Sequence, residues 1–222
     1  HFMMKEICEE PGAIKATIGP RIQNNQIVLD KVDISDEFIK NCEKINIIAC
    51  GTAYHAGVVG KYVIEKLARI PVEVDVASEF RYRDPIINEN QLTIVISQSG
   101  ETLDTLMAMR EARKRGSRII AIVNVVGSSI AREADDVLYT WAGPEIAVAS
   151  TKAYNTQLAA MYLFALTLAK KKGELSEEAY LNYITELQKL PQQVEEVLKD
   201  RESIQKFAYK HFNARSIFFV GR

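Results

Sequence analysis

The stretch LTIVISQSGETLDTLMAMREARKRG (residues 92–116) changes from a continuous apolar run to a helical pattern within a few residues. Its first part, 92–98, is rich in β-branched residues and almost uninterrupted in hydrophobicity, which is typical of a strand covered on both faces. Leu103, Leu106 and Met107 then recur at helical spacing, and a glycine ends the pattern behind a basic last turn. The stretch therefore predicts a strand, a short loop and a helix.

Four other short runs have the same composition as this strand. They are INIIACG (45–51), PVEVDVA (71–77), RIIAIVN (118–124) and DVLYTWA (136–142). Helical patterns separate several of them, and strands that alternate with helices form a parallel sheet covered on both faces. The sequence therefore predicts an α/β fold, a three-layer α/β/α sandwich around a five-stranded parallel sheet.

The helices around this sheet are expected from apolar spacing and from end signals. In residues 54–69, one apolar face is predicted at Val59, Tyr62, Val63 and Leu67. A long apolar helix is expected over about 150–171, and Ser176 is expected to cap the next helix. Pro191 is expected to start a further helix, and residues 214–222 are expected to form a new strand.

Composition and charge restrict the possible functions. The 222 residues are 47% hydrophobic and 26% charged with a net charge of −1, as in an ordinary globular protein. This charge gives no basic field for nucleic acid, and the longest apolar stretch (158–169) is about half of a membrane span. We therefore expect no nucleic-acid partner and no membrane segment. Cys8, Cys42 and Cys50 lack metal-ligand spacing, which favours a reducing, cytoplasmic setting without a metal site.

The loop SQSGET (97–102) is unusually rich in small polar side chains. Ser97, Ser99 and Thr102 carry hydroxyl groups and Gln98 carries an amide, with no lysine or arginine within the loop. Backbone N–H groups at a helix start bind anions, and the hydroxyls add further donors. We interpret the loop as a phosphate site made of neutral donors. The alternative is that Ser99 or Thr102 only caps the following helix.

Two other segments are expected at the same edge of the sheet, CGTAYHAG (50–57) and EIAVASTKAY (145–154). The carboxyl ends of parallel strands meet at one crevice, so these segments should face the SQSGET loop. Glycine-rich nucleotide fingerprints are absent from both. Cys50 is interpreted as a buried strand-end thiol and His55 as a helix-surface or core residue. Lys152, at a helix start, is expected to reach a carboxylate or a ligand.

Five segments in this order, HFMMKEI, CGTAYHAG, ASEFRYR, SQSGETLDTL and VASTKAY, resemble the isomerase half of the glutamine–fructose-6-phosphate aminotransferase family. That family builds this half from two tandem sugar isomerase (SIS) domains, each with a five-stranded parallel sheet. The resemblance implies that residues 1–44 are a helical lead-in from an absent glutaminase domain and that residues 45–212 are the first SIS domain with C-terminal helices. Residues 213–222 would be the opening strand of a truncated second SIS domain.

The resemblance also implies the substrate-binding residues. The sugar-phosphate contacts of the family fall on three loops of this sequence, at Thr52, Ser97, Gln98, Ser99, Thr102, Val148 and Ser150. One position departs from the family, which often has serine where this chain has Ala53. The family is dimeric, and the apolar helix over 150–171 and the SEFRYR segment are candidate surfaces for a homodimer.

The chemistry of the family sets the expected function. It takes ammonia from glutamine and converts fructose 6-phosphate into glucosamine 6-phosphate. Its proton-moving glutamate, ring-opening histidine and Schiff-base lysine belong to the second SIS domain or the C-terminal tail, beyond the matching segment. This chain is therefore expected to bind the phosphate end of the sugar without a cofactor, to hold no catalytic residue, and to be inactive by itself.

Two other classes of protein remain as alternatives. One is a sugar-phosphate-sensing regulatory module. The near-neutral net charge and the missing DNA-binding helix-turn-helix argue against it. The other is a sugar-amine deglycase, which acts in the breakdown direction. The HFMMKEI segment favours the aminotransferase, because in that family it marks the junction with a glutaminase domain.

Overall fold

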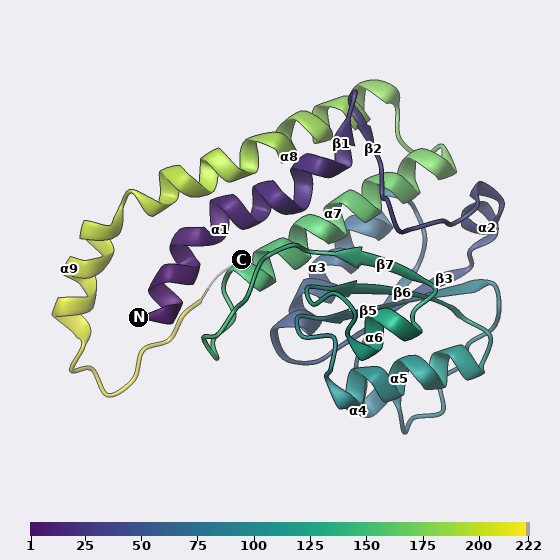
Figure 1. The fold of residues 1–222 in the computed structure, drawn as a ribbon, viewed down its shortest axis with the longest axis horizontal. Helices are drawn as coiled ribbons and strands as arrows, with labels where there is room; N and C mark the ends of the chain where they lie inside the picture. The colour runs from purple at the N-terminus through teal and green to yellow at the C-terminus, as the bar shows by residue number, and fades with distance from the viewer. Residues whose placement is uncertain (221–222) are drawn as a thin grey trace.

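The structure, a computed structural model, describes residues 1–220 and contains one five-stranded sheet. Its strands are β3 (Lys44–Ala49), β4 (Val72–Val76), β5 (Gln91–Ser97), β6 (Arg118–Val123) and β7 (Asp136–Tyr139). They lie in the order β4-β3-β5-β6-β7, and every neighbouring pair is parallel (Figure 1). The predicted fold class and all five predicted strands are therefore confirmed.

Each face of the sheet is covered by its own layer of helices. Alternate residues of β5 serve the two layers, with Ile94 and Ile96 in one core and Val95 in the other. The first core is closed by α3 (Gly51–Leu67) and α7 (Lys152–Lys172), with α2 (Asp36–Asn41) nearby. The second is closed by α4 (Ala77–Phe80), α5 (Leu103–Lys114) and α6 (Ser129–Glu133). Burial on both faces explains why the strands read as continuous apolar runs.

The buried face of α3 differs from the predicted one. Tyr62 is 67% exposed, and the buried residues are Ala53, Ala56, Gly57, Gly60, Ile64 and Leu67. This face is made of small residues because α3 packs closely on α7: a Cβ atom added at Gly60 would lie 2.2 Å from the methyl group of Met161. Leu103 is likewise exposed at the start of α5, whereas Leu106 is buried.

The N-terminal residues form a second layer outside α7. Helix α1 (Phe2–Ile18) packs against α7 and against α8 (Glu177–Leu198), and Figure 1 shows α1 and α8 side by side. A short 3₁₀ turn, η1 (Gly19–Arg21), and the hairpin β1 (Ile22–Gln23) and β2 (Gln26–Ile27) lead from α1 to the sheet. Residues 1–44 thus contain the helices α1 and α2, a 3₁₀ turn and a hairpin.

The C-terminal helices confirm one prediction and correct another. Ser176 caps α8 as expected, its Oγ accepting a hydrogen bond from the Ala179 amide at 3.2 Å. Pro191, however, lies inside α8 rather than at the start of a new helix. Proline removes one helical hydrogen bond, but Leu190 and Val194 on either side pack against the core and hold the helix together.

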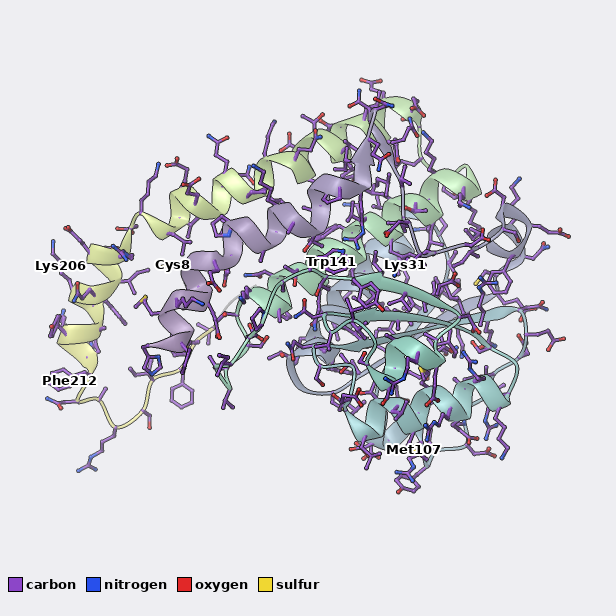
Figure 2. The ribbon with its side chains drawn as sticks, viewed as in Figure 1. Cys8, Lys31, Met107, Trp141, Lys206 and Phe212 are labelled. Atoms are coloured by element: carbon purple, nitrogen blue, oxygen red, sulfur yellow. The ribbon has the colours of Figure 1, made fainter. Side chains whose placement is uncertain are left out.

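Beyond α8, helix α9 (Arg201–His211) leaves the body of the molecule. It contains no buried residue; Figure 2 labels Lys206 on this helix and Phe212, an exposed residue that directly follows it. Residues 214–220 form no strand, because no neighbouring strand pairs with them in the described chain; the last two residues of the predicted strand, 221–222, lie outside the described residues. Within residues 1–220, no helix combines the length and the hydrophobicity needed to cross a membrane.

Candidate functional site

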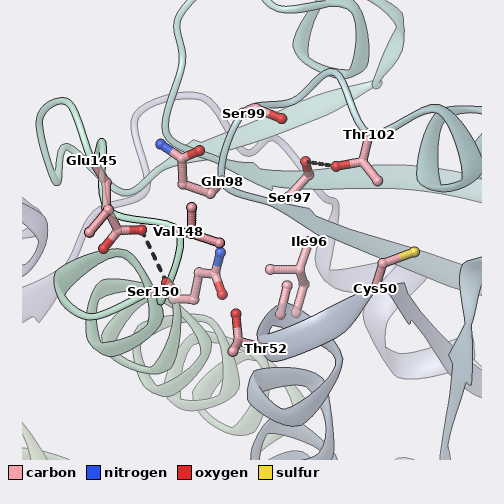
Figure 3. Close-up of a pocket in the computed structure, with 13 residues that line it drawn as sticks. Cys50, Thr52, Ile96, Ser97, Gln98, Ser99, Thr102, Glu145, Val148 and Ser150 are labelled. Carbon is pink, nitrogen blue, oxygen red and sulfur yellow. Dashed lines mark hydrogen bonds between the residues drawn. The ribbon is translucent and has the colours of Figure 1, made fainter. Parts of the chain in front are cut away.

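The site lies where the strand order of the sheet reverses. β3 and β5 are neighbours in the sheet although β4 lies between them in the chain, and a crevice forms at the carboxyl ends of such a pair. A cavity of ≈ 250 Å³ occupies this place (Figure 3). All seven residues predicted for the site line it: Thr52, Ser97, Gln98, Ser99, Thr102, Val148 and Ser150. The three predicted loops therefore meet at one cavity.

The SQSGET loop is held in shape by its own hydroxyl groups. The Ser97 Oγ accepts a hydrogen bond from the Gly100 amide at 3.0 Å and lies 3.0 Å from the Thr102 Oγ1. Gly100 has a φ of +66°, and a Cβ atom there would lie 2.0 Å from the Ser128 Oγ. Only glycine fits this position without strain and without displacing the segment before α6.

Helix capping does not explain the hydroxyl groups of this loop. Thr102 occupies the N-cap position of α5, yet its side chain makes no capping bond. The Ser99 Oγ accepts from the Glu101 amide at 3.2 Å, inside the loop rather than in the first turn of the helix. Glu101 itself turns to the neighbouring α6, where its carboxylate accepts from the Ser129 amide at 2.7 Å. The hydrogen-bonding groups of the α5 N-terminus thus remain for a ligand.

A second uncapped helix start faces the same cavity. Cys50 is the N-cap residue of α3 and makes no side-chain capping bond. The first turn of this helix supplies Thr52 and Ala53 to the cavity lining. Two helices, α3 and α5, therefore direct the positive ends of their dipoles toward one cavity, which favours an anion there.

The third helix start at the cavity is occupied by a carboxylate. Glu145 accepts hydrogen bonds from the amides of Thr151 at 2.9 Å and Ala153 at 3.1 Å, and from the Ser150 hydroxyl at 3.1 Å (Figure 3). These bonds satisfy the N-terminal donors of α7. The negative charge of Glu145 also disfavours a second anion on this side. The cavity is thus polarised, and its end at α3 and α5 is the one that favours an anion.

The lead-in helix α1 holds the Glu145 side of the cavity in place. Glu6, which is 2% exposed, accepts from the amides of Ile146 at 2.6 Å and Ala147 at 3.2 Å. Lys152 is also buried, and its Nζ donates to Glu9 at 2.7 Å. The prediction that Lys152 reaches a carboxylate is confirmed. This hydrogen bond holds the pKa of the Glu9 carboxyl below its ordinary value.

Two residues of the first loop have the modest roles expected for them. Cys50 is partly buried and accepts a hydrogen bond from the Thr105 hydroxyl, with an oxygen–sulfur distance of 3.8 Å. His55 is exposed on α3, with its ring edge-on to Tyr54.

Among the residues that the structure describes, no group of three or more His, Cys, Asp or Glu side chains could hold a metal ion.

Sequence reasoning missed two residues of the site, Glu145 and Gln157. Both line the cavity, and Gln157 is 3% exposed with a side-chain oxygen that has no hydrogen-bond partner in the described structure. Glu145 begins the EIAVASTKAY segment and could have been noticed as a carboxylate close to a helix start. Gln157 could have been noticed as an uncharged polar residue within an otherwise apolar helix.

Comparison with known proteins shows the family to which the chain belongs. The SIS domain family matches residues 38–167, and the chain belongs to that family. The whole chain is 65% identical to glutamine–fructose-6-phosphate aminotransferase [isomerizing] from Caldanaerobacter subterraneus and 60% identical to the protein of that name from Clostridium acetobutylicum. It spans 37% of the length of each of these relatives.

Solved structures of known proteins also superpose on this chain. The C-terminal domain of glucosamine-fructose-6-phosphate aminotransferase from Francisella tularensis superposes with a TM-score of 0.89 at 41% identity, over 94% of this chain and 59% of that one. Glucosamine-6-phosphate deaminase from Thermotoga maritima superposes with a TM-score of 0.65 at 22% identity, over 83% of this chain and 53% of that one. The second likeness shows a shared fold only.

Proposed function

We propose that this chain is the sugar-phosphate-binding SIS domain of a glutamine–fructose-6-phosphate aminotransferase. The whole protein would convert fructose 6-phosphate and glutamine into glucosamine 6-phosphate and glutamate. The observation that carries the proposal is the cavity between the uncapped starts of α3 and α5, which hydroxyl and amide side chains line. The high identity to aminotransferases over the whole chain disfavours the deglycase and the regulatory module as alternatives.

The polarity of the cavity supports one orientation of the sugar phosphate. The phosphate would lie at the α5 start, where Ser99, Thr102 and the amide of Gln98 offer donors to its oxygens. The sugar would extend toward Ser150 and the backbone beside Val148. Lysine and arginine are absent from the cavity lining within the described residues, so helix dipoles and neutral donors would carry the phosphate charge.

The same geometry supports a binding role without catalysis for this chain. Isomerisation requires a positioned acid–base group that exchanges a proton with the substrate. The one carboxylate that lines the described cavity belongs to Glu145. Backbone amides at the start of α7 donate to its Oε1, and the Ser150 hydroxyl donates to its Oε2. We therefore propose that the catalytic groups come from other parts of the whole protein and that this chain alone forms no glucosamine 6-phosphate.

The domain division and the assembly are proposals as well. We propose a lead-in over 1–44, a first SIS domain over 45–212 and the opening of a second SIS domain over 213–222, which agrees with the share of its relatives that the chain spans. We also propose a cytoplasmic homodimer, and the three free cysteines support a reducing compartment. Helix α7 does not support the dimer as an interface, because α1 and α3 of the same chain cover it.

Calorimetric titration of the chain with fructose 6-phosphate tests the function. We expect the wild type to bind fructose 6-phosphate and to bind fructose much more weakly. Ser99→Ala removes one donor to a charged group and should cost about 1.5–3 kcal/mol of binding free energy. Ser203→Ala, a change on the exposed helix α9, is the matched control and should leave the affinity unchanged. Wild-type protein that releases no binding heat with fructose 6-phosphate would overturn the proposal.

A further inference from the structure

Gln157 stands out among the residues that line the cavity. It lies on α7, its side chain is almost fully buried at 3% exposure, and its Oε1 has no hydrogen-bond partner in the described structure. Four buried side-chain atoms of the described residues share this condition, and of these residues only Gln157 lines the cavity. The unpaired oxygen therefore belongs to the site and not to the packing elsewhere.

A buried carbonyl oxygen without a donor costs free energy, so an unpaired one next to a cavity indicates a partner that the protein does not supply. Methionine or leucine would fill the same space in this apolar helix without that cost. The neighbours of Gln157 on the buried side of α7 are apolar, among them Ala153, Ala160 and Met161. A donor that enters the cavity, from water or from a ligand, would therefore satisfy this oxygen.

The type of partner follows from its hydrogen-bonding capacity. An amide oxygen only accepts, and it needs an O–H or N–H group. The dianion of a phosphate ester has no such group to offer, whereas each sugar hydroxyl does. Figure 3 shows Ser99 and Thr102 of the SQSGET loop on one side of the cavity and Ser150 on another; Ser150 lies two residues before α7, the helix that carries Gln157. The phosphate loop and Gln157 are thus placed for two different parts of one ligand.

We propose that Gln157 accepts a hydrogen bond from a hydroxyl group of the bound sugar and thereby selects sugar phosphates over inorganic phosphate. This inference rests on the function proposed above. The SQSGET loop binds any phosphate ester, and Gln157 adds affinity only where a hydroxyl group reaches it. The residue determines specificity by binding and takes no part in proton transfer.

Calorimetric titrations of wild type and Gln157→Met with fructose 6-phosphate and with inorganic phosphate test the inference. Methionine keeps the length of the side chain and removes the acceptor. We expect Gln157→Met to weaken fructose 6-phosphate binding about tenfold. The affinity for inorganic phosphate should change by no more than about twofold. Thr102→Val is the control, because it removes a donor at the phosphate end and should weaken the binding of both ligands. An equal change for both ligands, or no change for either, in Gln157→Met would overturn the inference.

A second measurement needs no variant. The wild type is titrated with hexyl phosphate, which has a chain of six carbons but no hydroxyl group. We expect hexyl phosphate to bind much more weakly than fructose 6-phosphate and with an affinity close to that of inorganic phosphate. Equal affinity for the two esters would overturn the role of Gln157 while leaving the phosphate site intact. If the wild type binds none of these ligands, the proposed function itself fails.

Discussion

Glu6 accepts a hydrogen bond from the backbone amide of Ile146 at 2.6 Å, although 140 positions separate the two residues in the chain. A second bond, from Ala147 at 3.2 Å, ends on the same carboxylate oxygen. The lead-in helix α1 thereby holds the wall of the cavity that includes Val148 and Ser150. The position of α1 and the shape of the proposed sugar site are linked through one buried carboxylate.

Replacing Glu6 tests this link. Glu6→Gln keeps the shape of the side chain, but it removes the charge and offers an NH₂ group to backbone donors. Hydrogen bonds to a charged group contribute about 1.5–3 kcal/mol, so we expect a loss of that order in the free energy of unfolding, measured by urea denaturation. Fructose 6-phosphate affinity should fall as well, because the wall loosens. Glu10→Gln on the same helix, which faces Asn155, is the control and should spare the affinity.

Gly100 is predicted to be irreplaceable in the phosphate loop. Gly100→Ala combines an unfavourable positive φ with a clash against the Ser128 Oγ. Gly127→Ala is a matched control, since Gly127 has a φ of +73° but no atom within 4 Å of an added Cβ. The control should lose about 1–2 kcal/mol of unfolding free energy, and Gly100→Ala should lose more and also bind fructose 6-phosphate less tightly. Equal losses in the two variants would contradict the clash.

Ala53 offers a change that should strengthen binding. It lines the cavity at the start of α3 and is 8% exposed, where the family often has serine. Ala53→Ser adds a donor near the phosphate, and after displacement of water we expect a gain of about 0.5–1 kcal/mol in binding free energy. Calorimetry with fructose 6-phosphate and a thermal melt of the same variant provide the check. A lower melting temperature with unchanged affinity would show that the hydroxyl is buried without reaching the ligand.

The ion pair between Glu9 and Lys152 predicts a pH dependence of stability. The hydrogen bond from Lys152 is the main cause that lowers the pKa of Glu9 from its ordinary value of 4.5. A carboxyl group whose pKa is lower in the folded state stabilises the protein above the ordinary value, and this contribution is lost as the pH falls through the folded pKa. Glu9 is partly exposed, so solvent screening reduces the effect.

Glu9→Gln should therefore flatten the dependence of unfolding free energy on pH in the window that begins near 4.5 and extends below it. Urea denaturation at a series of pH values measures the slope. The control is Glu174→Gln, at an exposed glutamate that forms no ion pair within the described residues. A slope in Glu9→Gln as steep as in the wild type would contradict the assigned role of the pair.

Local patterns in the sequence determined the sheet and the central loop of the site. The three central strands, β3, β5 and β6, are buried on both faces, so their continuous apolar runs are visible without knowledge of their neighbours. Ser97, Ser99 and Thr102 lie within one loop, and their crowding between a strand and a helix indicates an anion site by itself. Segments 50–57 and 145–154 could be added because parallel strands place their carboxyl ends at one edge, whereas Thr52 and Ser150 within them were implied by the family resemblance.

Only the tertiary structure decided which groups remain free at that site. On α3, small residues such as Gly60 face α7 and Tyr62 is exposed, although Leu67 is buried as predicted. Helix α8 continues through Pro191 because residues on either side of it pack against the core. The carboxylate of Glu145 accepts hydrogen bonds at the start of α7, whereas Gln157, which lines the cavity, has a buried amide oxygen without a partner in the described structure. Partners in such contacts lie far apart in the chain, as Glu6 and Ile146 do. Local periodicity in the sequence therefore does not predict them. Hydrophobic pattern is a property of neighbouring residues, but the pairing of a buried polar group depends on the whole fold.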